Sequence, residues 1–109
     1  MNNDGHAAEL FHSLSDANRL AIVRRLSRGE ARVKDLVEET GLAQSTVSAH
    51  IACLRDCALI EGTPVGRQTS YRIIEPGLIA LLAVAEQLLD STGHPVHLCE
   101  KHHLEGPVA

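Results

Sequence analysis

Hydrophobic residues recur at helical spacing along most of this chain, and the period changes to strand-like alternation only once. In a helix, apolar residues three and four positions apart share a face, whereas in a strand every second residue does. Five helices are therefore predicted, over Asp4–Leu14, Ser15 to about Gly29, Val33–Thr40, Ala43–Cys57 and Pro76–Asp90. The pattern predicts a mainly α fold in which one β-hairpin separates the fourth helix from the fifth.

Residue types at the helix ends support these boundaries. Ser15 and Asp16 are favoured N-cap types, and Gly41 suits the position that follows a helix C-terminus. The fourth helix carries one apolar stripe, formed by Val47, Ile51, Leu54 and Ala58. We expect this stripe to face the core.

The hairpin is predicted from Leu59–Thr63 and Thr69–Ile74, joined by a turn at Pro64-Val65-Gly66. The helix after it is apolar almost all round, so its second side is expected to meet another subunit. We divide the chain into a domain over 1–90 and a polar, His-rich tail over 91–109.

Composition limits the function classes. A length of 109 residues suits one domain, and an aromatic content of 2% predicts an aliphatic core. The first residues do not resemble a secretory signal and no apolar run would cross a bilayer, so we expect a cytoplasmic protein with no membrane partner and reduced cysteines. The chain has no Gly-rich phosphate loop, which argues against an enzyme.

A net charge of −4 does not exclude binding to nucleic acid, because basic residues gather in the first third of the chain: Arg19, Arg24, Arg25, Arg28, Arg32 and Lys34.

Two short helices joined at Gly41-Leu42 are typical of a helix-turn-helix. The second presents hydrogen-bonding side chains near its N-terminus, namely Gln44, Ser45, Thr46, Ser48 and His50, which suit base edges and phosphates. The hairpin adds Arg67, Gln68 and Arg72, which suit the DNA backbone or the minor groove. An ordinary solvated helix start and incidental arginines are the alternatives.

The cysteines are candidate metal ligands. Cys53 and Cys57 are one helical turn apart, so their side chains are neighbours on one face. Cys99 lies in the tail among several histidines. Three thiolates favour Cd(II), Pb(II) or another thiophilic ion, and added imidazoles suit Zn(II). The alternatives are small buried hydrophobes at 53 and 57 and adventitious metal binding by the tail.

The sequence resembles the ArsR/SmtB family. Residues 42–51 resemble its recognition helix, 15–20 the opening of its second helix, and Gly66-Arg67 with Tyr71-Arg72 its wing. The resemblance covers roughly Ala8 to Asp90. It implies a winged helix-turn-helix (α-α-α-α-β-β-α) and a homodimer that joins through its first and last helices. Such a dimer would bind double-stranded operator DNA of twofold symmetry.

Residues 51–59 resemble the same stretch in the cadmium- and lead-sensing CmtR subgroup of that family. By position, the resemblance implies Cys53, Cys57 and Cys99 as metal ligands, the last reaching across the dimer. His97 or His102 would add to Cys99 or replace it.

The hypothesis that follows is a metal-responsive repressor. The apo dimer would bind operator DNA, and Cd(II) or Pb(II), with Zn(II) as an option, would release it. Two alternatives stay open: a repressor that responds to thiol oxidation or persulfide formation, and a metal-buffering protein that never binds DNA.

Overall fold

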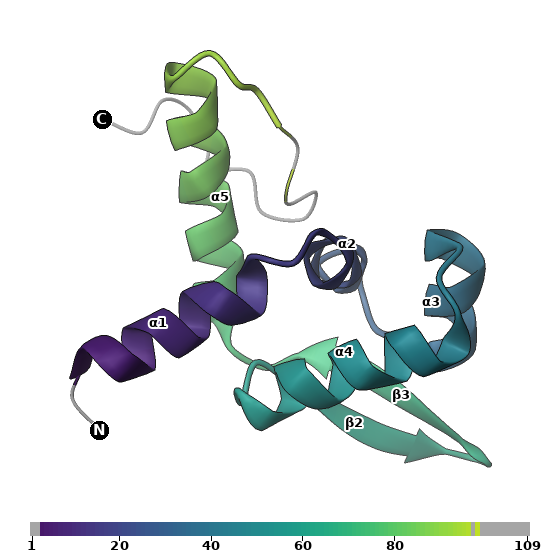
Figure 1. The fold of residues 1–109 in the computed structure, drawn as a ribbon. Coiled ribbons are helices and arrows are strands. Elements are labelled where there is room, and N and C mark those ends of the chain that lie inside the picture. Colours follow the sequence, from purple (N-terminus) through teal and green to yellow (C-terminus); the bar gives the residue numbers. More distant parts are fainter. Residues whose placement is uncertain (1–2, 97, 99–109) are drawn as a thin grey trace.

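Five helices and a small sheet make up the structure, a computed structural model that describes residues 3–96 and 98. The helices are α1 (Asn3–Leu14), α2 (Ala17–Leu26), α3 (Val33–Thr40), α4 (Gln44–Asp56) and α5 (Pro76–Ser91). Helices α2, α3 and α4 gather into one body, and α5 rises away from it (Figure 1). The predicted mainly α fold with one hairpin is confirmed.

The sheet differs from the prediction in two places. Its strands are β1 (Ala31–Arg32), β2 (Ile60–Val65) and β3 (Gln68–Ile73), paired antiparallel in the order β1-β3-β2. The two-residue strand β1 was not predicted. The predicted turn at Pro64–Gly66 was wrong, because Pro64 lies within β2 and the turn is Gly66-Arg67. Since β2 is an edge strand, it tolerates a residue without an N–H.

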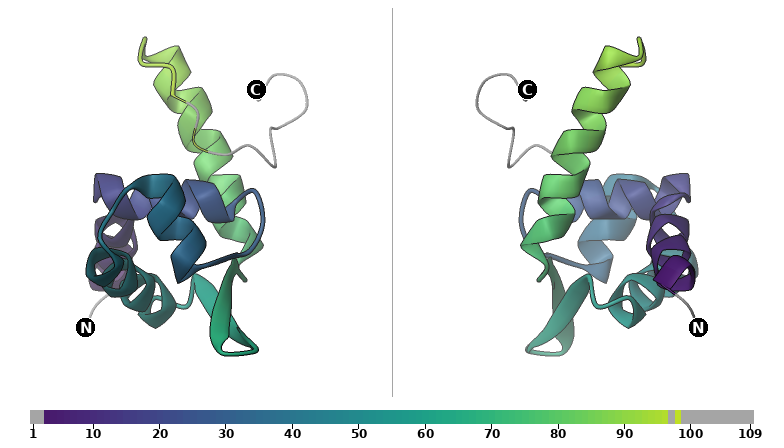
Figure 2. Two further views of the ribbon diagram at one scale, coloured as in Figure 1. Left: turned by 90° about the vertical axis from the view of Figure 1, so that its right-hand side faces the viewer. Right: turned by 90° about the vertical axis from the view of Figure 1, so that its left-hand side faces the viewer.

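The hairpin turn has a specific backbone requirement. Val65 pairs with Gln68, which leaves a loop of Gly66 and Arg67 only. Gly66 has a φ of 64°, and a glycine at positive φ in the first loop position is the arrangement of a type II′ turn. The hairpin projects from the helical body, and this turn lies at its far end (Figure 2).

The join between α1 and α2 is built by two side chains. Asp16 is the N-cap of α2 and accepts hydrogen bonds from the backbone N–H groups of Asn18 (2.8 Å) and Arg19 (3.0 Å). Arg19 donates through its guanidinium to the carbonyl oxygens of Ser13 (2.7 Å) and His12 (3.1 Å) at the end of α1. The predicted N-cap role of Asp16 is confirmed.

The core is aliphatic and lies where the three central helices meet the sheet. Its fully buried side chains include Ile22, Val23, Leu36, Val47, Leu54 and Ile60. Val47, Ile51 and Leu54 of the predicted α4 stripe are buried, but Ala58 is exposed, and its assignment to the stripe was wrong.

Ala58 falls outside the stripe because α4 ends before it. Ala58 has a φ of 60°, and the N–H of Leu59 bonds to the carbonyl of Leu54 (3.1 Å) while that of Ala58 bonds to Arg55 (2.9 Å). Those two bonds form a Schellman ending, which normally places glycine at the left-handed position.

Helix α5 packs on the body along one side only. Leu78, Ile79 and Leu82 are buried, whereas Val84 and Leu88 are exposed, Leu88 to 64%. Phe11 of α1 is also exposed, to 59%. None of the described helices is long and apolar enough to cross a membrane.

The structure also describes part of the segment after α5. Helix α5 ends at Ser91, one residue beyond the predicted domain boundary. Leu98 packs into the core cluster and is 6% exposed, and its N–H donates to Glu86 Oε1 (3.0 Å). Part of the predicted tail therefore lies against the domain.

Candidate DNA-binding and metal sites

Helices α3 and α4 form the predicted helix-turn-helix. Gly41 ends α3 in the left-handed conformation (φ 75°), and its N–H donates to the carbonyl of Val37 (3.0 Å). The Thr40 hydroxyl donates to the Leu36 carbonyl (2.6 Å) and accepts from the N–H of Leu42 (3.2 Å). The turn is thus fixed by hydrogen bonds on both sides, which sets the direction of α4.

The N-terminal end of α4 is polar and open. Gln44, Ser45 and Ser48 are exposed, and Thr46 is half-buried. The N-cap residue Ala43 makes no side-chain hydrogen bond to the first turn. The N–H groups there are free of a side-chain cap, and with the helix dipole they favour a phosphate or another acceptor.

His50, the fifth predicted DNA residue of this helix, is turned inward. Its side chain is 14% exposed, and its Nε2 lies 3.8 Å from a carboxylate oxygen of Asp16. The backbone N–H of Arg19 lowers the pKa of Asp16, with smaller contributions from Asn18, His50 and the Arg19 charge. His50 therefore joins α4 to the start of α2 and is turned away from the exposed side chains of the helix N-terminus.

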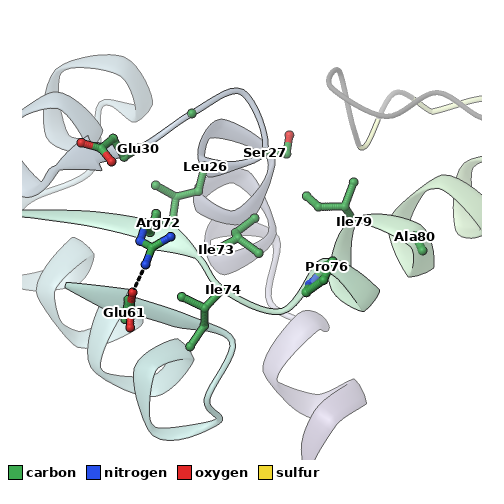
Figure 3. Close-up of a pocket in the computed structure, with 11 residues that line it drawn as sticks. Leu26, Ser27, Glu30, Glu61, Arg72, Ile73, Ile74, Pro76, Ile79 and Ala80 are labelled. Carbon is green, nitrogen blue, oxygen red and sulfur yellow. Dashed lines mark hydrogen bonds and ion pairs between the residues drawn. The ribbon is translucent and has the colours of Figure 1, made fainter. Parts of the chain in front are cut away.

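The three predicted hairpin residues have different surroundings. Arg67 is exposed in the turn. Gln68 accepts a hydrogen bond from Arg32 Nη1 (2.8 Å) through Oε1. Arg72 pairs with Glu61 on the neighbouring strand, at the wall of a hollow that includes Pro76 of α5 (Figure 3). Arg67 and Gln68 are thus both exposed at the hairpin tip, but Gln68 is held by Arg32.

Arg32 ties the hairpin to the helix-turn-helix. Its guanidinium donates to Asp35 (3.1 and 3.2 Å) as well as to Gln68, and its backbone N–H also bonds to Asp35 (3.0 Å). These hydrogen bonds lower the pKa of Asp35, the side-chain bond from Arg32 most. The sequence offered no signal for the bridge to Gln68, because the partners are 36 residues apart.

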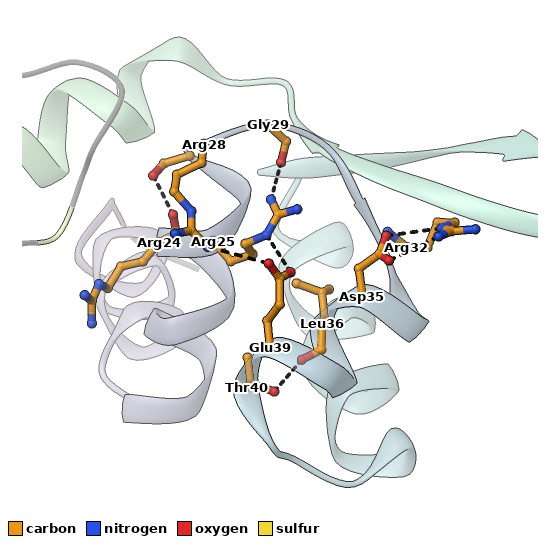
Figure 4. A network of polar contacts seen from close by, with 10 residues as sticks. Arg24, Arg25, Arg28, Gly29, Arg32, Asp35, Leu36, Glu39 and Thr40 are labelled. Carbon is orange, nitrogen blue, oxygen red and sulfur yellow. Dashed lines mark hydrogen bonds and ion pairs between the residues drawn. The ribbon is translucent and has the colours of Figure 1, made fainter.

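Two acidic residues of α3 are engaged by arginines rather than free (Figure 4). Asp35 meets Arg32, and Glu39 accepts from Arg25 Nε (2.7 Å). Arg25 also donates to the carbonyl of Gly29 (3.0 Å). These pairs join α3 to α2 and to the strand before α3, so they support the fold.

The candidate metal ligands Cys53 and Cys57 lie at the C-terminal end of α4. Both are free thiols of intermediate exposure, so neither is sealed in the core. The N–H of Cys57 bonds to the carbonyl of Cys53 (3.1 Å), which preserves the helical turn between them. Cys57 is the C-cap and packs partly against the core. Two soft donors one turn apart fit a thiophilic ion, but they fill only part of its coordination.

The other predicted ligands lie outside the described residues: Cys99, His97 and His102. Among the residues that the structure does describe, no three His, Cys, Asp or Glu side chains gather closely enough to hold an ion. The pair at the end of α4 is therefore the part of the predicted site that the structure describes.

Comparisons with known proteins agree with this architecture. The family described as "Bacterial regulatory protein, arsR family" matches residues 16–61, which span α2, the helix-turn-helix and the start of β2. The HTH-type transcriptional regulator CmtR of Mycobacterium bovis is 34% identical over 82 residues, covering 75% of this chain and 70% of that protein. A Streptomyces lividans protein named "Probable mercury resistance operon repressor" is 29% identical, covering 91% of this chain and 79% of its own length.

A solved structure supports the same fold. The solution NMR structure of the homodimeric winged helix-turn-helix DNA-binding domain Mb0332 from Mycobacterium bovis has a TM-score of 0.75 at 27% identity. The match covers 85% of this chain and 88% of that one. The named relatives are transcriptional regulators, which confirms the prediction that the chain is not an enzyme. This chain belongs to the ArsR family of bacterial regulatory proteins.

Proposed function

We propose that the protein is a metal-responsive transcriptional repressor: a homodimer that binds operator DNA without metal and leaves it when Cd(II) or Pb(II) binds. One observation carries the proposal. A single helix, α4, presents exposed hydrogen-bonding side chains at its N-terminal end and two accessible thiols at its C-terminal end. The relatives named as CmtR and as a mercury resistance operon repressor support it.

The dimer is supported by apolar surface that one chain leaves open. Phe11 of α1 and Val84 and Leu88 of α5 are exposed, and the family resemblance implies a dimer that joins through these two helices. The related domain Mb0332 is homodimeric. A twofold dimer would place its two α4 helices in successive major grooves, about 34 Å apart. A cytoplasmic location is part of this proposal.

The metal assignment rests on donor chemistry. Thiolates of Cys53 and Cys57 would bind the ion, with Cys99 as the third sulfur donor and His97 or His102 as supplementary donors. Thiolates prefer soft ions, which favours Cd(II) and Pb(II), whereas a larger share of imidazole would favour Zn(II).

Metal binding at the C-terminal end of α4 would affect DNA binding at its N-terminal end because the middle of the helix is packed in the core. Val47, Ile51 and Leu54 are buried along its middle, so the helix has little freedom to bend. A shift imposed on Cys53 or Cys57 is therefore carried to Gln44 and Ser45. A coupling free energy of about 1–3 kcal/mol would change DNA affinity roughly 5- to 150-fold.

The direct test is a mobility-shift titration of Cd(II) into the complex of the protein with its own promoter DNA. We expect Cys53→Ser and Cys57→Ser each to bind DNA normally and to resist release. Ala52→Ser is the matched control, because it adds a hydroxyl to the same half-buried part of α4 and keeps both thiols. It should bind and release as the wild type does. Normal release of either cysteine variant would contradict the assignment.

The same experiment separates the alternatives. Release by a mild oxidant, without thiolate-to-cadmium charge-transfer absorption, would replace the metal trigger with a redox trigger. A disulfide between Cys53 and Cys57 would need distortion of α4, because residues one turn apart are near the upper limit for bridging. A wild-type protein that binds Cd(II) but not its promoter would instead be a metal buffer.

A further inference from the structure

A groove of about 460 Å³ runs between α3 and the hairpin and opens beside Gln44 at the start of α4. In Figure 1 the end of α3 that leads into α4 and the hairpin tip lie on the same side of the molecule. The charged and amide side chains that line the groove are Arg32, Lys34, Glu38, Gln44, Arg67 and Gln68.

Most of the charged side chains that line the groove are basic. Lys34 and Arg67 are exposed, and neither forms an ion pair within the part of the chain that the structure describes. Arg32 also lines the groove, but Asp35 balances its charge, and Glu38 is the only acid among the lining residues. Two uncommitted cations on opposite walls favour an anion between them.

The two walls are held at a fixed separation. Arg32 bonds at once to Asp35 in α3 and to Gln68 at the start of β3. Strand β1 reinforces this link, because Ala31 pairs with Tyr71 and Arg32 with Ser70. The groove is therefore preformed and would not need to be ordered by its ligand, which lowers the entropic cost of binding.

We propose that this groove binds the phosphodiester backbone of DNA, with Lys34 as a phosphate contact from α3 and Arg67 as its counterpart from the hairpin. The inference rests on the proposed function and adds a contact to it. In duplex DNA one backbone strand separates the major groove from the adjacent minor groove. With α4 in the major groove and the hairpin tip at the minor groove, that strand has to pass between them. The basic groove lies at this position.

Arg32 acts here as a positioning residue, since its guanidinium is committed to Asp35 and Gln68. Glu38 opposes the phosphate and weakens binding. A phosphate contact fixes the register of the protein on the duplex without reading sequence. Lys34 should therefore strengthen binding to any duplex by the same factor.

The test compares Lys34→Gln, Glu38→Gln and the control Arg24→Gln in the full-length protein without metal. DNA affinity is measured at several salt concentrations, on promoter DNA and on a scrambled duplex. Arg24 is an exposed arginine on α2 that lines a different hollow, with Asn18 and Ala21. It matches the charge change of Lys34→Gln at a site away from the groove.

We expect Lys34→Gln to weaken binding about five- to tenfold near 0.1 M salt. The slope of log affinity against log salt should fall by about 1.8, because the dimer loses two phosphate contacts at about 0.9 each. Both duplexes should lose affinity equally. Glu38→Gln should tighten binding about threefold, which a folding defect would not produce. Arg24→Gln should leave affinity and slope unchanged.

An unchanged slope for Lys34→Gln, or an equal loss for Arg24→Gln, would overturn the groove assignment. Metal-induced release of the same variants is measured in parallel. If Lys34→Gln shows normal metal-induced release and an unchanged salt slope, the groove does not bind DNA, but the proposed repressor function stands. Failure of the wild type to bind promoter DNA would overturn the proposed function itself.

Discussion

The two ends of α4 differ in chemistry although they belong to one continuous helix. The N-terminal end is exposed, polar and without a side-chain cap, with Gln44 and Ser45 turned to solvent. The C-terminal end carries Cys53 and Cys57, is partly packed against the core, and closes on a left-handed Ala58. One end suits a polyanion and the other a soft cation.

What joins them is the buried middle of the helix. Val47 and Leu54 are completely buried and Ile51 is 2% exposed. We expect a helix packed along its middle to move as one body, so under the proposed function occupancy of one end would affect binding at the other.

The largest effect is expected from Leu54→Ala, which removes part of the shared core. The cavity and the lost transfer free energy should lower the free energy of unfolding by about 2–5 kcal/mol. Urea denaturation monitored by circular dichroism measures it. Because the change weakens the connection between the ends, the Cd(II)-dependent loss of DNA affinity should shrink in the folded variant. A loss below about 0.5 kcal/mol would show that α4 is not held by its middle.

Gln44→Ala tests the DNA end alone. A side chain that makes a good bidentate contact to a base contributes about 1–3 kcal/mol of discrimination, so affinity for promoter DNA should fall by that order. Cd(II) affinity should not change, since Gln44 lies at the other end of α4 from the thiols. Fluorescence anisotropy gives the first quantity and charge-transfer absorption the second. A matching fall in Cd(II) affinity would mean that the ends are not chemically separate.

Ala58→Gly tests the helix ending beside the two thiols through its effect on stability. Ala58 has a φ of 60°, where a Cβ is unfavourable. Glycine removes that strain but makes the unfolded chain freer, so the net gain should be about 0.5–1 kcal/mol. Thermal unfolding measures the gain. Ala49→Gly, in the middle of the same helix, should instead destabilise the protein, and equal effects of the two variants would contradict the assigned helix ending.

The smallest effect concerns pH. The pKa of Asp16 is lowered from 3.8, chiefly by the N–H of Arg19, so its contribution to stability is present above that value. It is lost as the pH falls through the lower pKa of the folded state. Asp16→Asn keeps a capping oxygen but does not titrate, so its stability should fall less steeply between about pH 5 and pH 2. If the free energy of unfolding fell equally steeply at low pH in the wild type and in Asp16→Asn, the ionised Asp16 cap would not stabilise the protein.

Much of the fold could be predicted because helices leave a long periodic signal. All five helices and the hairpin were placed from spacing and from caps such as Asp16 and Gly41. Strand β1 was missed because two residues, Ala31 and Arg32, are too few to show a period. The hairpin turn was misplaced because Pro64 is a turn signal in sequence, and only its position on an edge strand makes it a strand residue.

The candidate site was predictable in residue type but not in orientation. Spacing alone indicated the thiol pair and the polar start of α4. It did not show that His50 turns toward Asp16, that Gln68 is held by Arg32, or that Arg72 pairs with Glu61. Each of these partners belongs to another element, so its contact exists only after the chain has folded. The same reason explains why Lys34 was seen as one of many basic residues and not as the wall of a groove.

The central claim is that an ion at one end of α4 opposes DNA at the other. Linkage makes this reciprocal, so the most direct measurement is Cd(II) affinity of the wild-type protein, free and bound to promoter DNA. The account predicts that DNA weakens Cd(II) binding by the same factor by which Cd(II) weakens DNA binding, and that Ala52→Ser preserves the effect. Equal Cd(II) affinity in the free and DNA-bound protein would contradict it.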